Sequence, residues 1–202
     1  MKNMQTVLPT LLAAAAAVLL APAAAQATDL KVVNVNAPKI NCVFDASCKV
    51  VVTDSVGSLQ FTQLGGGARL QSRTFVAKPG TPGAGTTAYL YRVDLTQPAT
   101  IFTDCLSGMV LNFGPAVTLN YAPNTPAQVY VITTGGLGSV GIKSAVQTGN
   151  VIEFDFTGYL CAGATSFFFG LAAKKPPIAL NATLFGIGPT PIIQTAARVP
   201  LH

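Results

Sequence analysis

Glu153 and Asp155 form the pair of carboxylates in this sequence whose spacing could support acid–base chemistry. Alternation along a β-strand would place both on one face, about 7 Å apart by strand rise, within the broad range of inverting glycosidase pairs. The chain has only seven acidic residues. Two acids on a solvated strand face, paired across strands with Arg69, Arg73 or Arg92, explain the pattern better. We therefore predict that the protein is not a carboxylate-based hydrolase and not an enzyme.

Those three arginines stand in predicted strands of a chain in which only 9% of the residues are charged. Guanidinium groups bind carboxylates in a bidentate manner, so the cluster Arg69, Arg73 and Arg92 could receive a carboxylate or an anionic sugar. The interpretation that we favour is an internal ion-pair network with Asp94 or with the carboxylate pair named above.

Aromatic side chains offer a second candidate for ligand binding. Tyr89 and Tyr91 share one face of a predicted strand and could stack on a sugar ring. The chain has no tryptophan, which weakens a glycan-binding interpretation. Phe167, Phe168 and Phe169 place rings on both faces of another predicted strand, as expected where both faces are covered, and we assign them to the core.

Nucleotide and metal chemistry find little support in the residue pattern. Residues 136–141 read Gly-Leu-Gly-Ser-Val-Gly, but a dinucleotide site needs this pattern between a strand and a helix, with an acidic residue about 20 positions later. A strand is predicted after it, so we interpret the segment as a glycine-rich strand or turn. The one histidine is the final residue, His202, where a Ser-His-Asp triad is not expected. We predict no cofactor and no metal.

The four cysteines, Cys42, Cys48, Cys105 and Cys161, predict two disulfides. An even number of cysteines in an exported chain is typical of a disulfide framework. Three pairings are formally open, and we favour Cys42–Cys48 and Cys105–Cys161. The absence of a Cys-x-x-Cys pair argues against a zinc site and against redox catalysis.

The N-terminal residues 1–27 follow the order of a secretory signal peptide. Lys2 precedes an apolar stretch, and Ala25-Gln26-Ala27 forms a small-x-small cleavage site. We predict cleavage after Ala27 and a single secreted domain over residues 28–202, with an N-terminal membrane anchor as the alternative. No later apolar run reaches 18 residues, so we expect no transmembrane segment after cleavage. The expected location is the secreted or periplasmic space or the cell surface.

The basic residues are scattered along the chain, although the net charge is +5. Nucleic-acid-binding proteins gather lysine and arginine on one face or one helix. Only Lys174 and Lys175 are adjacent here. We predict no nucleic-acid partner.

Most of the chain after residue 28 alternates with period two or is rich in β-branched residues, which predicts strands. Gly and Pro clusters punctuate these runs as turns. The pattern predicts an all-β, antiparallel β-sandwich, jelly-roll or immunoglobulin-like, that is stapled by two disulfides. Strands are expected at 30–36, 49–53, 68–78, 86–96, 109–113, 116–121, 128–133, 139–143, 151–157, 166–171, 178–185 and 192–199. The linker 78–86 is expected to be a mobile hairpin tip or a binding loop.

A small outer-membrane β-barrel is the alternative fold, because such barrels also combine a signal peptide with alternating strands. The strands here lack regular aromatic girdles, and the chain ends in Pro200-Leu201-His202 without an aromatic terminal strand. The predicted long-range disulfide also suits a packed sandwich better.

Two classes of function remain after these exclusions. The first is an exported, non-catalytic structural or surface protein of an envelope, matrix or adhesive assembly, because low charge and many apolar residues suit a surface that neighbours cover. The alternative is an extracytoplasmic module that binds a glycan or another ligand. The first class predicts self-association or envelope and matrix partners, and the second predicts a monomer with one concave site.

Overall fold

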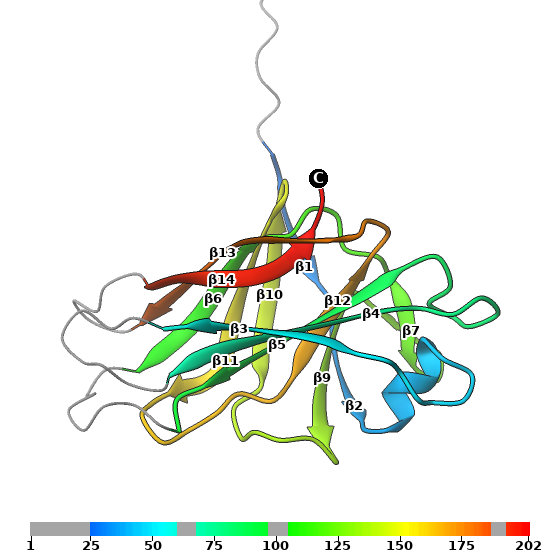
Figure 1. The fold of residues 1–202 in the computed structure, drawn as a ribbon. Helices are drawn as coiled ribbons and strands as arrows, with labels where there is room; N and C mark the ends of the chain where they lie inside the picture. Colours follow the sequence, from blue (N-terminus) through cyan, green and yellow to red (C-terminus); the bar gives the residue numbers. More distant parts are fainter. Residues whose placement is uncertain (1–24, 60–67, 97–104, 187–192) are drawn as a thin grey trace, which may run out of the picture.

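Two stacked six-stranded β-sheets form the body of the protein (Figure 1). The computed structural model describes residues 25–59, 68–96, 105–186 and 193–202, so most of the predicted signal peptide lies outside the described residues. The first sheet has the order β1 (Ala27–Leu30), β10 (Ile142–Thr148), β11 (Val151–Leu160), β6 (Leu106–Asn112), β13 (Pro177–Gly186) and β14 (Ile193–Pro200). The second sheet has the order β2 (Val32–Asn36), β9 (Val129–Thr134), β12 (Phe169–Ala173), β5 (Thr87–Asp94), β4 (Arg69–Val76) and β3 (Thr53–Ser58).

A short hairpin of β7 (Leu119–Ala122) and β8 (Thr125–Ala127) and one 3-10 helix, η1 (Lys39–Val43), complete the described elements. The predicted all-β sandwich is confirmed. Among the residues that the structure describes, no helix is long and apolar enough to cross a membrane.

The main core lies between the two sheets and follows the alternation of the strands. In β11, Ile152, Phe154 and Phe156 are buried, whereas Glu153 is exposed and Asp155 is half-buried on the opposite, outer face. Because inward side chains alternate with outward ones, the hydrophobic pattern of this strand sets its register. The predicted faces of this strand are therefore confirmed.

Residues 27–36 contribute one strand to each sheet. β1 pairs antiparallel with β10 in the first sheet, and β2 pairs parallel with β9 in the second. At Lys31 the chain changes sheets: the Lys31 N–H donates to Gln128 Oε1 at 2.8 Å, and the Lys31 carbonyl accepts from the N–H of Val129 at 3.1 Å. The single strand predicted over 30–36 is therefore wrong at its start, and the β2–β9 pair makes the second sheet mixed rather than purely antiparallel.

The predicted strand 49–53 is also wrong, because the strand at this place, β3, begins only at Thr53. Val51 is 86% exposed and precedes the paired residues. β-branched residues favour a strand only where a neighbour accepts their backbone hydrogen bonds. Here the antiparallel pairing with β4 starts at Thr53, which lies opposite Thr74.

A second hydrophobic cluster covers part of the outer face of the second sheet. We call η1 with the segment 44–52 that follows it, the β7–β8 hairpin and residues 78–86 the cap. Phe44, which directly follows η1, is fully buried, and its ring centroid lies 5.1 Å from Phe75, 6.3 Å from Tyr121 and 6.2 Å from Tyr130. Because both faces of the second sheet are covered here, β5 and β12 are buried along almost their whole length.

Both predicted disulfides are present. Cys42–Cys48 closes the turn after η1, and Cys105–Cys161 joins the residue before β6 to the residue after β11. These strands are neighbours in the first sheet, where Leu106 lies opposite Leu160. One disulfide therefore holds the cap and the other holds the first sheet.

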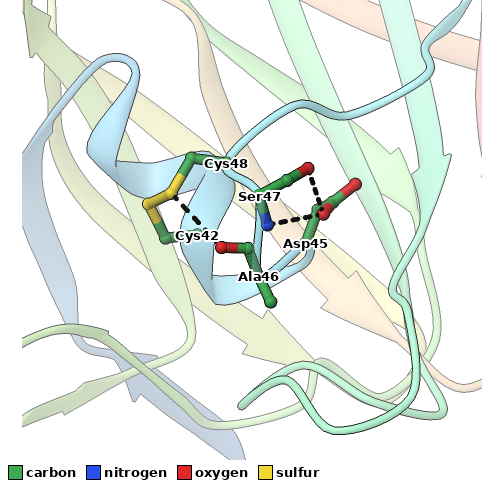
Figure 2. The surroundings of a disulfide bond; sticks show 5 residues. All are labelled: Cys42, Asp45, Ala46, Ser47 and Cys48. Atoms are coloured by element: carbon green, nitrogen blue, oxygen red, sulfur yellow. Dashed lines mark hydrogen bonds between the residues drawn. A yellow bond between two sulfur atoms is a disulfide. The ribbon is translucent and has the colours of Figure 1, made fainter.

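The linker 78–86 is tied to the cap by hydrogen bonds. The N–H groups of Lys78 and Gly83 donate to the carbonyls of Phe44 and Val43, each at 2.8 Å. The Lys78 ammonium lies 2.6 Å from Asp45 Oδ2. Asp45 Oδ1 in turn accepts hydrogen bonds from the N–H and the hydroxyl of Ser47, beside the Cys42–Cys48 disulfide (Figure 2). Residues 78–86, for which a mobile hairpin tip or a binding loop is expected, are thus part of the cap and contact the segment that follows η1.

Asp45 is expected to make the stability of the fold sensitive to acid. The hydrogen bond from Lys78, followed by those from Ser47, lowers the pKa of Asp45 from 3.8 to about 2. Because the folded-state pKa lies below the ordinary value, this stabilisation is complete above about pH 4 and is lost as the pH falls towards 2. We expect Asp45→Asn to lower the thermal denaturation midpoint at pH 7, and the gap to wild type to narrow between pH 4 and pH 2. Circular dichroism melts at pH 7, 4, 3 and 2 measure this, and a gap that does not vary with pH would contradict it.

Candidate functional site

An open cleft with a volume of about 360 Å³ lies on the outer face of the second sheet, beside the cap. Its floor comes from β4, β5, β9 and Phe168, the residue that precedes β12. One wall comes from η1 and the segment after it, and the other comes from the loop that follows β9. The lining residues are Ala37, Asn41, Val50, Val52, Gln71, Arg73, Phe75, Leu90, Arg92, Ile132, Gly135, Gly136, Leu137 and Phe168.

Arg73 is held at the cleft by a carboxylate on the neighbouring strand. In the register of β3 and β4, Asp54 lies opposite Arg73. The guanidinium donates from Nε to Asp54 Oδ1 at 2.7 Å and from Nη2 to Oδ2 at 2.9 Å, and Gln71 Nε2 donates to the same Oδ2 at 3.3 Å. The hydrogen bonds from Arg73 are the main reason that the pKa of Asp54 lies below its usual value. A bidentate pair fixes the plane of the guanidinium as well as its position.

Arg92 is held by Asp94 on its own strand and by Thr165. Its Nη2 lies 3.1 Å from Asp94 Oδ2, and its Nε donates to Thr165 Oγ1 at 3.0 Å. Asp94 Oδ2 also receives Arg69 Nη2 at 3.1 Å, while Asp94 Oδ1 accepts from the N–H and the hydroxyl of Thr96. Burial raises the pKa of Asp94, but these hydrogen bonds and the positive charges outweigh it, and the pKa is lowered.

One phenyl ring lies beneath both cleft arginines. The Cζ atom of Arg73 is 5.0 Å from the ring centroid of Phe168, and that of Arg92 is 5.6 Å from it. A guanidinium over an aromatic face at this range is attracted by the ring quadrupole. The two cations are therefore fixed side by side by the sheet register, by their carboxylates and by a shared ring.

The predicted arginine network is confirmed in part. Arg69 and Arg92 share Asp94, as expected. Arg73 pairs with Asp54 instead, which lies opposite it on β3. The sequence does not predict β3 over 53–58, so this partner is not expected from it. Arg69 does not line the cleft, so the structure separates one structural arginine from two at the site.

Glu153 and Asp155 lie far from this network in the fold. They are on β11 in the first sheet, whose neighbours are β10 and β6, whereas the arginines are on β4 and β5 in the second. The expected cross-strand pairing with Arg69, Arg73 or Arg92 is therefore wrong. Asp155 Oδ2 accepts a hydrogen bond from Ser144 Oγ at 2.8 Å.

Tyr89 and Tyr91 do share a face, but this face points into the main core. Both side chains are fully buried. The Tyr89 hydroxyl donates to the carbonyl of Lys175 at 2.6 Å, and the Tyr91 hydroxyl donates to the carbonyl of Arg198 at 2.5 Å. The sugar-stacking role considered for them is wrong, because neither ring has an exposed face.

Several cleft residues were missed by the sequence analysis, although two left a signal. The alternation in β4 places Gln71 beside Arg73, and the aromatic run at 167–169 puts Phe168 on the face opposite Phe169. The glycine-rich segment 136–141, predicted as a strand or turn, is an irregular loop with an isolated bridge at Val140, and Gly136 and Leu137 form a wall of the cleft. In the described residues, no group of three or more His, Cys, Asp or Glu side chains has the geometry of a metal site.

Comparison with known proteins gives no relative for this arrangement. No protein-family model, no curated protein sequence and no solved structure matches the chain.

Proposed function

We propose that the protein is a non-catalytic, extracytoplasmic binding module whose binding site is the cleft between the cap and the loop after β9. The observation that carries this proposal is the pair of guanidiniums, Arg73 and Arg92, fixed side by side at an open cavity. A concave site of a few hundred Å³ with apolar walls and a few convergent polar groups is typical of small-molecule binding.

The preformed state of the cleft supports binding over a merely structural role for the arginines. Asp54, Asp94 and Phe168 already hold the two guanidiniums in place without a ligand. Binding then costs little side-chain ordering, which favours affinity. The cap wall is likewise fixed, by a disulfide and by the Lys78–Asp45 pair.

The extracytoplasmic location is part of the proposal. It is supported by the signal-peptide pattern of residues 1–27. It is also supported by the two disulfides, which persist mainly in oxidising compartments.

A structural or surface protein that self-associates is the second candidate. It is favoured by two exposed valines that line one shallow hollow at the edge of the second sheet: Val51 at 86% and Val76 at 72% exposure. Exposed apolar side chains that gather at one place often mark a contact surface. In this case, the function of the protein would be self-association rather than the binding of a small molecule.

Filling the cleft is expected to abolish ligand binding and leave the fold intact. Leu137 lines the cleft and is 63% exposed, so Leu137→Trp adds an indole at the cleft without disturbing a packed core. Amide NMR spectra of the oxidised protein, titrated with benzoate, benzamide, glucose and glucuronate, should show shifts at cleft residues for at least one compound. The variant should lose these shifts.

Leu180→Trp is the matched control, because Leu180 is 36% exposed on β13 in the other sheet. This variant should bind as the wild type does. If no compound shifts a cleft resonance, the binding function is contradicted. Assemblies that grow with concentration in light scattering would then support the structural candidate.

A further inference from the structure

We propose that the ligand of the cleft is a small organic monoanion, a carboxylate on an apolar body, with the carboxylate between Arg73 and Arg92. This inference rests on the proposed binding function and names the ligand class. It is carried by the charge balance, by the free donors of the two guanidiniums and by the chemistry of the walls.

The charge balance of the network leaves room for one negative charge. Arg69, Arg73 and Arg92 are paired with only two carboxylates, those of Asp54 and Asp94. One positive charge is therefore not compensated within the network. A monoanion would neutralise it, whereas a dianion such as phosphate would reverse its sign.

The two cleft guanidiniums also keep donors available. Arg73 uses Nε and Nη2 on Asp54, and Arg92 uses Nε on Thr165 and Nη2 on Asp94. Within the described part of the chain, Nη1 of neither residue has a hydrogen-bond acceptor. The side chains of Arg73 and Arg92 are 30% and 13% exposed. Partly desolvated cations attract an anion more strongly than cations in open water do.

The remaining walls favour an apolar body over a sugar or an amine. Apolar side chains of the cap segment, of β9 and of the loop after it line the cavity: Val50, Val52, Ile132 and Leu137. Asn41 and Gln71 are the uncharged polar side chains among the described lining residues. No acidic residue is among them, so a cationic ligand would meet two guanidiniums without a counter-charge at the cavity surface.

The ligand class is tested with four probes that separate charge from shape. We expect benzoate to bind the cleft, and benzamide, which lacks the charge, to bind about tenfold more weakly or worse, since a charge-assisted hydrogen bond contributes about 1.5–3 kcal/mol. Acetate keeps the carboxylate and lacks the body, and glucuronate places it on a polar body. Both should be weaker than benzoate. NMR titrations at constant salt give the dissociation constants.

Variants of the arginine network are expected to change the affinity for benzoate in opposite directions. Asp54→Asn removes the negative charge that competes with benzoate for Arg73 but keeps an amide oxygen that can hold the guanidinium, so benzoate should bind more tightly, by about threefold or more, a gain that misfolding cannot produce. The pair Asp54→Asn/Arg73→Gln should weaken benzoate by about tenfold relative to wild type. Lys143→Gln is the control, because Lys143 carries the same charge at an exposed position of β10 in the other sheet, and it should leave the affinity within about twofold.

The outcomes distinguish this inference from the proposed function. If benzamide or glucose binds the cleft as well as benzoate does, the binding function stands and the carboxylate assignment is overturned. The same conclusion follows if benzoate binds in the cleft but Asp54→Asn weakens it. If neither glucose nor any of the four probes reaches the cleft, both proposals fail together.

Discussion

Phe169→Ala is expected to destabilise the protein by about 3–5 kcal/mol, the range for removing a buried phenyl ring from a packed core. The Phe169 side chain is fully buried between the two sheets. Its ring centroid lies 5.1 Å from Phe154, 5.9 Å from Tyr91 and 6.4 Å from Phe156. Phe154 and Phe156 belong to the first sheet and Tyr91 to the second, so this ring joins the aromatic contacts of both layers.

Chemical denaturation of the oxidised protein measures this effect. Tyr159→Ala is the control: Tyr159 is also aromatic but 63% exposed on β11, and its loss should change the free energy of unfolding by no more than about 0.5 kcal/mol. Equal losses for the two variants would show that the aromatic core between the sheets is not the main source of stability.

The fold class could be predicted because alternation and punctuation are local signals. In β11 the inward and outward residues follow directly from the sequence, since one face of this strand packs on the core and the other faces solvent. Of the three possible disulfide pairings, the one favoured from the sequence is the one present. Its longer disulfide, Cys105–Cys161, joins two neighbouring strands.

The partners of each strand could not be predicted, because pairing is decided by the whole chain. The valines at 50–52 have strand propensity but precede the residues that pair with β4, and the less apolar segment 53–58 is the strand instead. Propensity describes a fit to a half-buried pleated surface, and the surface must exist first. For the same reason, no residue pattern around Lys31 indicates that the chain changes sheets there.

The arginines of the candidate site could be predicted from the sequence, but the cleft and the partner of Arg73 could not, because these depend on which strands pair. Sequence alone grouped Arg69, Arg73 and Arg92 with carboxylates and named Asp94 among them, but it also offered Glu153 and Asp155 of the first sheet as partners. Asp54 is the true partner of Arg73, and it comes from the edge strand that was missed. The cleft itself depends on the cap, whose position against the second sheet no periodicity encodes.

The two disulfides are expected to have separable effects. Removing Cys105–Cys161 by Cys105→Ala/Cys161→Ala should cost about 4 kcal/mol, and removing Cys42–Cys48 in the same way should cost about 2 kcal/mol, by the chain-entropy relation for the two loop lengths. The reason is the sequence separation of the linked residues, which is 56 for the first pair and 6 for the second. Denaturant unfolding of the two double variants measures the difference.

Removal of the two disulfides should affect benzoate affinity in the opposite order to stability, with the larger loss of affinity on removing Cys42–Cys48. Cys42–Cys48 lies in the cap, directly between the cleft residues Asn41 and Val50, so its removal should loosen that wall and weaken benzoate binding. Cys105–Cys161 ties β6 to β11 in the other sheet and should leave the affinity of the folded protein unchanged. A variant without Cys42–Cys48 that keeps full affinity would show that the wall is held by the Lys78–Asp45 pair and apolar packing alone.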